Sequence, residues 1–206
     1  MKKLIETIKN IFKIEELRKR ILFTLSLLLV YRLGSFVVIP GINPQALNDL
    51  QSQVDGNGLL GLLNIFSGGA FSNASIFALG IMPYISASIV IQLLGIVVPY
   101  FQKLQKEGES GRRKINQWTR YLTIIVLLLQ APAYLANLHG TLPPYAFVLG
   151  QSSILFTVSA TIVLIAGTMF VMWLGEKITD KGIGNGVSLV IMVGIIARLP
   201  HALLAE

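Results

Sequence analysis

The sequence predicts an all-α membrane protein, a multi-spanning bundle with five transmembrane helices. Three observations support this. First, 53% of the 206 residues are apolar and 13% are charged, whereas about 25% are charged in ordinary soluble domains. Second, no charged residue lies between Asp55 and Lys103 or between Arg120 and Glu176. Third, each of these gaps exceeds the roughly 20 helical residues that cross a bilayer, so the excess apolar surface is expected to face lipid.

The spans are placed by the uncharged stretches and by the turn-forming residues that interrupt them. The second gap is broken near its middle by Asn137, His139, Gly140, Pro143 and Pro144, so it is expected to hold two helices joined as a hairpin. The five predicted spans are residues 21–40, 76–98, 120–138, 153–174 and 183–199.

Two local features are expected inside and between these spans. Pro83 is expected to kink the second span because it removes one backbone hydrogen bond, and Ser88 and Gln92 lie on one face of the same helix. The glycine-rich segment 175–186 is expected to reverse the chain sharply, with Asn185 capping the fifth span.

Residues 1–20 combine seven basic residues with regularly spaced apolar ones, which is typical of an amphipathic helix lying on a membrane surface. A cleaved signal peptide is the alternative interpretation. It is disfavoured because the apolar run from Ile21 is long, contains Arg32 and lacks a small-x-small cleavage site.

The basic residues also predict the orientation of the chain. Fifteen of the 17 Lys and Arg residues fall before Ile21, between Lys103 and Arg120, or at positions 177 and 181, and segments 41–75 and 139–152 contain none. Because positive loops remain in the cytosol, the N-terminus is expected to be cytosolic. The net charge of +7 then reflects topology, and no direct binding of nucleic acid is expected. The loop with Arg112, Arg113 and Lys114 is predicted to be cytosolic.

Segment 56–73 is apolar in part but rich in glycine and too short to cross the bilayer. It is predicted either to fold back into the membrane as a mobile, cavity-blocking element or to form an ordinary surface loop with a helical turn.

Catalysis is not expected from this sequence. The chain has no cysteine, which excludes a thiol nucleophile and thiolate-bound metals. His139 and His201 have no carboxylate cluster nearby, and Ser110 has no histidine to activate it. The sequence therefore predicts no metal site and no cofactor, and leaves transport or scaffolding as the function.

Two long segments resemble signature segments of the SecY family. Residues 75–92 read SIFALGIMPYISASIVIQ, and residues 173–190 read WLGEKITDKGIGNGVSLV. The segments KEGESGRRK, FSGGA and RLGSFVVIPGI, which begin at Lys106, Phe66 and Arg32, are also similar to bacterial members, so the resemblance covers essentially the whole chain.

This resemblance implies the pore-forming subunit of the general secretion channel, a conduit for unfolded polypeptides in the bacterial cytoplasmic (inner) membrane. It implies two five-helix halves related by inverted symmetry, of which residues 1–206 resemble the N-terminal half. The implied partners are the C-terminal SecY half, SecE-like and SecG-like subunits, a SecA-like motor or ribosome, signal peptides and nascent chains, and the lipid bilayer.

The resemblance also assigns residues to three sites. The pore constriction would comprise Ile81, Ile85, Val187 and Ile191; each pair is spaced i,i+4, which places it on one helical face, although such residues could also be plain core or lipid-facing aliphatics. Gln92 and Gln130 fall on one wall of the lateral gate. The plug would comprise Leu60, Leu63, Phe66, Ser67, Gly68, Gly69, Ala70 and Phe71.

Two other functions remain as alternatives. The chain could be a stand-alone membrane scaffold or could pair with a second copy as a homodimeric half-channel; inverted symmetry would require an antiparallel pair, which the one-sided Lys and Arg distribution opposes. A small-solute transporter is less favoured, because such proteins place polar or ionisable groups at the midplane, and only Gln92 and Gln130 are candidates.

Overall fold

The computed structural model describes residues 14–47, 58–148 and 154–204, and these form helices and connecting loops. The described residues contain no strand beyond two isolated bridges, Val38 with Ser75 and Ile42 with Phe147. The helices are α2 (Glu15–Gly34), η1 (Pro44–Ala46), α4 (Gly58–Phe66), α5 (Met82–Val97), α6 (Pro99–Lys106), α7 (Glu109–Thr141), η2 (Pro144–Ala146), α8 (Ile154–Lys181) and α9 (Gly186–Leu204), where η denotes a 3₁₀ helix. The all-α prediction is confirmed for these residues.

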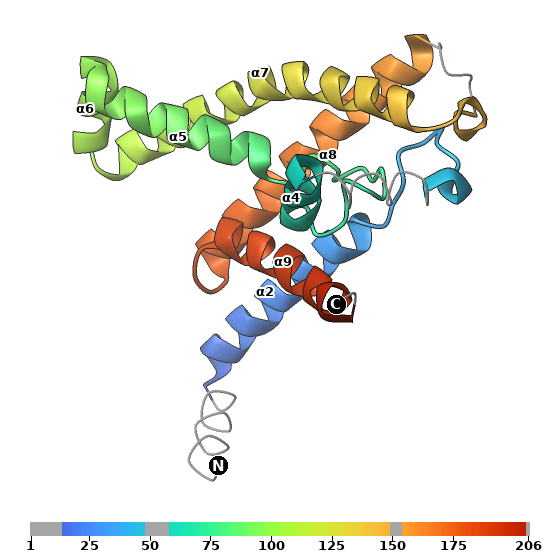
Figure 1. The fold of residues 1–206 in the computed structure, drawn as a ribbon. Helices are drawn as coiled ribbons and strands as arrows, with labels where there is room; N and C mark the ends of the chain where they lie inside the picture. The colour runs from blue at the N-terminus through green and yellow to red at the C-terminus, as the bar shows by residue number, and fades with distance from the viewer. Residues whose placement is uncertain (1–13, 48–57, 149–153, 205–206) are drawn as a thin grey trace.

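Figure 1 shows how the helices are arranged around α8. This helix contacts α2, α7 and α9. The helices α5 and α7 run beside each other, and α6 packs on both of them at one end. The short helix α4 lies near the centre, close to α9.

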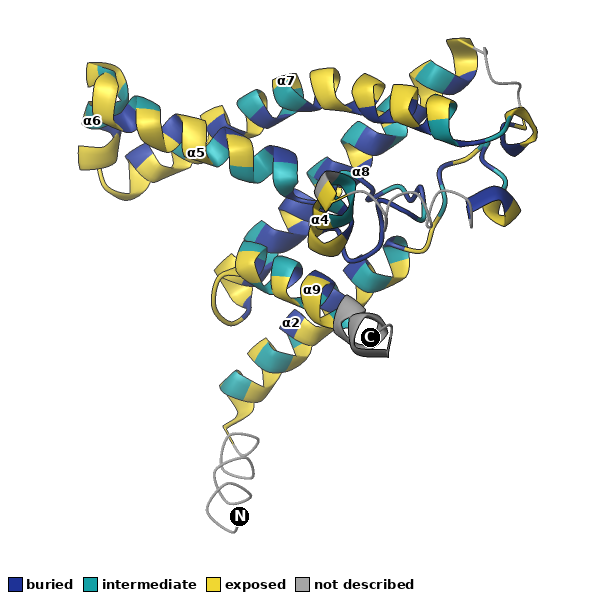
Figure 2. Cartoon of the chain, viewed as in Figure 1, coloured by how far each residue is buried: buried dark blue, intermediate teal, exposed yellow. Residues whose placement is uncertain are grey.

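Two helices in the described residues, α7 and α8, are long and apolar enough to cross a membrane. A third candidate is the pair α5 and α6, which is bent by 99°. Large aliphatic side chains on these helices face outward; Ile154 is 80% exposed and Leu129 is 74% exposed. Figure 2 shows exposed residues along α5 and α7 and a buried loop after α4. Outward apolar surface of this extent is what a lipid-facing protein presents.

The structure differs from several predicted boundaries. The first helix ends at Gly34, so residues 35–40 are not helical, and α5 begins only at Met82. Conversely, α7 already begins at Glu109 and α8 continues to Lys181. The prediction that residues 112–114 form a loop is therefore wrong, because these residues are helical and lie in the first turns of α7. Of the predicted amphipathic helix 1–20, residues 1–13 lie outside the described residues, and 15–20 form the start of α2.

The predicted kink at Pro83 is also wrong. Pro83 lies in the first turn of α5, where a backbone N–H would have no partner within the helix in any case. The bend instead follows Val98, where Pro99 opens α6. Asn185 does cap α9 as predicted, because its Oδ1 accepts a hydrogen bond from the Ser188 N–H at 3.2 Å.

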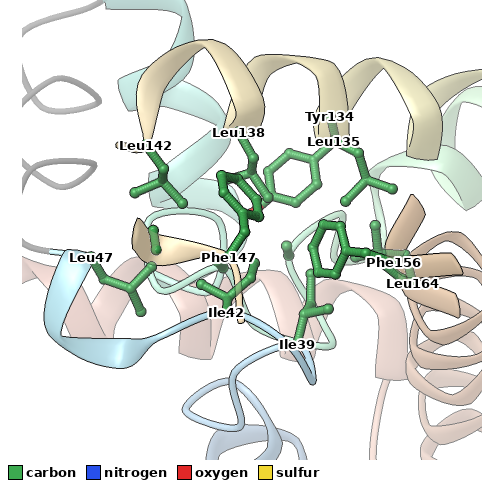
Figure 3. Packing of buried hydrophobic residues seen from close by; sticks show 14 of the residues in the cluster. Ile39, Ile42, Leu47, Tyr134, Leu135, Leu138, Leu142, Phe147, Phe156 and Leu164 are labelled. Carbon is green, nitrogen blue, oxygen red and sulfur yellow. The ribbon is translucent and has the colours of Figure 1, made fainter. Parts of the chain in front are cut away.

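The first core cluster joins the segment after α2, the C-terminal half of α7 and the start of α8 (Figure 3). Phe147 and Phe156 pack edge to face with ring centroids 5.4 Å apart. The segment after α2 is also tied to the loop after α4, since the Ile39 N–H donates to Ala74 O at 2.9 Å and the Ile76 N–H donates to Val37 O at 2.9 Å. The packing of this cluster and these two backbone bonds together hold the loop that follows α4 in position.

The second core cluster lies between α2, α8, α9 and the residues that lead into α5. Phe77 stacks on Tyr31 of α2 and on Phe170 of α8, with centroid separations of 6.0 and 5.9 Å. Fully buried aliphatic residues of α8, Val171, Leu174 and Ile178, line the same cluster. Ile81, the residue before α5, and Val187, in the first turn of α9, both pack in this cluster.

Candidate functional site

The four residues predicted for the constriction belong to this second cluster. Ile81 is a buried member, 3% exposed, while Ile85, Val187 and Ile191 are partly buried and pack against it. The structure therefore brings together two helix starts that are about a hundred positions apart in the sequence. All four side chains are branched and apolar, a composition that resists wetting in a narrow passage.

Gly175 of α8 shows how closely the two pairs approach each other. A Cβ placed on Gly175 would lie 3.4 Å from Val187 Cγ2 and 3.6 Å from Ile81 Cδ1. Ile81 and Val187, one residue from each pair, therefore both pack beside Gly175. Helix α8 thus holds these two side chains in position relative to each other.

The pairs differ in how they continue away from that point. The Ile85 N–H donates to Ile81 O at 3.1 Å, so these two residues stand one turn apart at the start of α5. Ile191 lies one turn after Val187 and lines a shallow apolar hollow on α9 together with Ser188, Met192, Ile195 and Ile196. The exposed apolar residues of α9 therefore lie next to Ile191, which packs against the second cluster.

The predicted plug segment forms the short helix α4 followed by a tight, buried loop. Leu60 and Leu63 of α4 pack against the first cluster, of which Phe71 is a member, and Ala70 belongs to the second. Phe66 is the last residue of α4 and is partly exposed. The segment therefore bridges the two clusters.

The loop after α4 is held in part by hydrogen bonds among its own residues. Ser67 Oγ donates to Asn64 O at 3.1 Å and accepts from the Phe71 N–H at 3.1 Å. Gly68 and Gly69 both have φ in the left-handed region, +65° and +89°, which favours glycine because other residues carry a Cβ there. The ordinary surface loop considered above does not describe this segment, since its residues from Ser67 to Phe71 are buried.

The two predicted gate residues are not brought into contact in the described residues. Gln92 is exposed on α5 and its Nε2 donates to Ser88 Oγ at 3.2 Å, which confirms that these two share a face. Gln130 is exposed on α7 and lines a mostly apolar hollow of about 300 Å³ between α4, α5 and α7. The hollow also contains Leu60, Leu63, Phe71, Met82, Ser86 and Tyr134.

Two of the three predicted basic residues, Arg112 and Arg113, line a larger, charged hollow of about 880 Å³ from α7. Val187, one of the residues predicted for the constriction, also lines it. Arg113 pairs with Glu109 at 3.0 Å and Lys114 with Glu107 at 3.5 Å. The charged hollow therefore opens directly beside the apolar cluster.

Sequence reasoning missed an ion pair that crosses this hollow. Arg120 of α7 donates to Glu176 of α8 through Nε at 3.1 Å and Nη2 at 2.6 Å. The available signal was their position, because these two residues flank the second uncharged stretch. The hydrogen bonds from Tyr31, Arg32 and Tyr134 to the loop after α4 were also missed and carry no sequence signal of their own.

Known proteins resemble this chain over most of its length. The model of the SecY family matches residues 75–205, which include α5, α7, α8 and all four residues of the proposed constriction. The chain is 50% identical over 188 residues to the protein translocase subunit SecY of Escherichia coli strain K12, covering 91% of this chain and 42% of that protein.

Two further relatives carry the same name. The protein from Aquifex aeolicus is 45% identical over 201 residues, with 97% of this chain and 47% of the relative covered. The protein from Streptomyces coelicolor is 48% identical over 200 residues, with 94% and 46% covered. The chain thus spans less than half the length of these three relatives.

Proposed function

Because this chain belongs to the SecY family, we propose that it forms the N-terminal half of a protein-conducting channel in the bacterial cytoplasmic membrane. The channel passes unfolded polypeptides across and into the membrane; it is a conduit and not an enzyme. The observation that carries the proposal is the convergence of Ile81, Ile85, Val187 and Ile191 on one apolar cluster backed by α8.

The proposed constriction works by excluding water. Branched aliphatic side chains in a narrow passage cannot solvate an ion, but they can move aside for an extended chain that fills the passage. Two helices supply half of such a ring, and an inverted second half would supply the rest. The segment 56–73, with α4 beside α9, would act as the plug.

We propose that five spans cross the membrane, with the N-terminus in the cytosol. Besides α7 and α8, the 20 residues of α2 reach about 30 Å at 1.5 Å per residue, the thickness of the hydrocarbon core. The helices α5 and α9 would complete the set. The amphipathic α6 would lie along the cytosolic surface of the membrane, near the basic first turns of α7.

The proposed partners follow from the same membership. The C-terminal half of the channel completes the constriction, and SecE-like and SecG-like subunits stabilise the assembly. A SecA-like motor or a ribosome delivers the nascent chain to the cytosolic side. Gln92 and Gln130 would stand on the wall through which signal peptides and hydrophobic segments reach lipid.

The test is crosslinking of a polypeptide arrested during translocation. In the complete channel, a photoreactive side chain at Ile85 or Val187 should crosslink to the arrested chain, whereas the same group at the exposed Leu93 of α5 should not. Equal crosslinking at Leu93, or none at the two constriction positions, would contradict the proposal. Uphill movement of amino acids or ions by reconstituted protein would favour a solute transporter instead.

A further inference from the structure

We infer that Tyr31 and Arg32, consecutive residues of α2, act as a latch that holds α4 in its closed position. The inference deepens the proposed function, because it names the residues that would set how readily the plug leaves. It rests on the hydrogen bonds that these two side chains make to the turn at the end of α4.

The end of α4 has a defined hydrogen-bonding geometry. The Gly69 N–H donates to Asn64 O and the Gly68 N–H donates to Ile65 O. This pair of bonds, with Gly68 in the left-handed region, is a Schellman motif. It satisfies the carbonyls of residues 64 and 65, and the Ala70 N–H donates to Ser67 O at 3.3 Å.

Tyr31 adds a second donor to Ser67 O, and Arg32 donates to Gly68 O. The Tyr31 hydroxyl donates to Ser67 O at 3.2 Å, and Arg32 Nη1 donates to Gly68 O at 2.6 Å. The Arg32 guanidinium is held over the Phe36 ring, 5.3 Å from its centroid. Its positive charge also lies at the C-terminal end of α4, where the helix dipole favours a cation.

The turn is also packed against α9. A Cβ on Gly194 would lie 3.2 Å from Phe66 O and 3.3 Å from Gly68 N, so the backbones of α9 and the turn are nearly in contact. Hydrogen bonds from α2 and close packing against α9 therefore both hold the turn. On α4 itself, Leu62 and Ile65 are exposed while Leu60 and Leu63 pack against the first cluster, so the α2 bonds add to this packing in holding the helix.

The segment after the two glycines is held by different contacts. The Tyr134 hydroxyl of α7 donates to Phe71 O at 2.9 Å, and the backbone bonds of residues 74 and 76 tie the loop to the segment after α2. Two hydrogen bonds cross the glycines and tie α4 to this loop, since the Ser72 N–H donates to Asn64 Oδ1 at 3.1 Å and the Phe71 N–H donates to Ser67 Oγ at 3.1 Å. Loss of the α2 bonds would leave these local bonds in place and would lower the free energy needed to move α4 away from its closed position.

The test uses the complete channel, with its C-terminal half and small partner subunit, free of other cysteines. This chain has none of its own, so Leu63→Cys reports alone. Leu63 is half-buried against the first cluster and becomes accessible when α4 leaves. The measurement is the rate at which a membrane-impermeant maleimide added from the outer side labels this thiol in the resting channel.

Tyr31→Phe removes one oxygen atom and keeps the stacking on Phe77. It should raise the labelling rate about fivefold, the change expected for one neutral hydrogen bond. Arg32→Gln should raise the rate about tenfold or more, because its bond is charge-assisted. Arg32→Lys, which keeps the charge and one donor, should fall between wild type and Arg32→Gln. If the Arg32→Gln channel fails to assemble, the labelling rates of Tyr31→Phe and Arg32→Lys test the latch instead.

Tyr134→Phe is the matched control, since it removes an equivalent bond on the anchored side and should leave the labelling rate near wild type. Unchanged labelling in the α2 variants, or an equal rise in Tyr134→Phe, would overturn the latch. The outcome is separable from the proposed function: polypeptide crosslinks at Ile85 and Val187 with unchanged labelling reject only the latch. Faster labelling without those crosslinks supports the hold of α2 on α4 and rejects the channel.

Discussion

Arg120 and Glu176 form a two-point ion pair that joins α7 to α8. The Glu176 side chain is 16% exposed and the Arg120 side chain is 47% exposed. They are the last and first charged residues around the second uncharged stretch, so the pair marks where the uncharged part of each helix ends. It also crosses the charged hollow that opens beside Val187.

We expect Glu176→Gln to reduce the free energy of unfolding by roughly 1–2 kcal/mol. Charge-assisted hydrogen bonds contribute about 1.5–3 kcal/mol, and the exposure of Arg120 lowers this through solvent screening. Unfolding of the purified protein in detergent measures the change. Glu109→Gln, which breaks the exposed pair with Arg113, should change stability by less than about 0.5 kcal/mol; similar losses in both variants would contradict the expectation.

Polar substitution in the constriction is expected to make the resting channel leak. Ile81→Asn or Ile85→Asn places an amide in the apolar cluster, which lets water enter and lowers the barrier to small ions. In the complete channel, single-channel recordings should show a higher resting conductance. Leu93→Asn, on the exposed face of α5, is the control, and unchanged conductance in the first two variants would remove these residues from the constriction.

The basic start of α7 is expected to control orientation or docking of a cytosolic partner. Changing Arg112, Arg113 and Lys114 together to Glu removes the positive charge that, in the proposed topology, would keep this end in the cytosol. Side-specific thiol labelling should then detect a larger fraction of misoriented protein, or secretion of a reporter should fall. Arg112→Lys with Arg113→Lys keeps the charge and should behave as wild type. Normal insertion and secretion of the Glu variant would leave this region without a role.

Gly186→Ala is expected to destabilise the protein by about 1–3 kcal/mol, the usual cost of overpacking. A Cβ at Gly186 would overlap Gly175 O and lie 2.7 Å from Ile178 Cβ, so α9 would have to move away from α8. Gly140→Ala is the matched control, because nothing lies within 4 Å of its Cβ position. Thermal unfolding in detergent compares the two, and an equal effect would show that the α8–α9 approach can relax.

The start of α9 shows how local sequence signals succeed. Asn185 has a short polar side chain placed just before an apolar run, and its bond to the Ser188 N–H forms within one turn. Composition and charge spacing likewise determined the all-α, membrane-type character of the chain. Such features depend on neighbours in sequence and on transfer from water to lipid, so the sequence alone carries them.

Boundaries near proline and glycine were decided by context. Pro83 can either kink a helix or begin one, and the packing of residues 76–81 against α8 and α2 determines that α5 begins at Met82. The basic segment at residues 112–114 is helical because α7 continues past the membrane-length apolar run. The absence of charged residues from a stretch indicates that the stretch can lie in the membrane. It does not indicate where the helix that contains the stretch begins or ends.

Contacts between distant residues belong to the tertiary structure alone. The i,i+4 spacing places Ile81 with Ile85 and Val187 with Ile191, but only the packing of Ile81 and Val187 beside Gly175 of α8 brings the two pairs together. Similarly, Arg32 reads in the sequence as a charge at the end of a span, and the fold turns it toward Gly68 O. The sequence determines which side chains are apolar enough to exclude water and which can donate a hydrogen bond. The tertiary structure determines which distant residues those side chains contact.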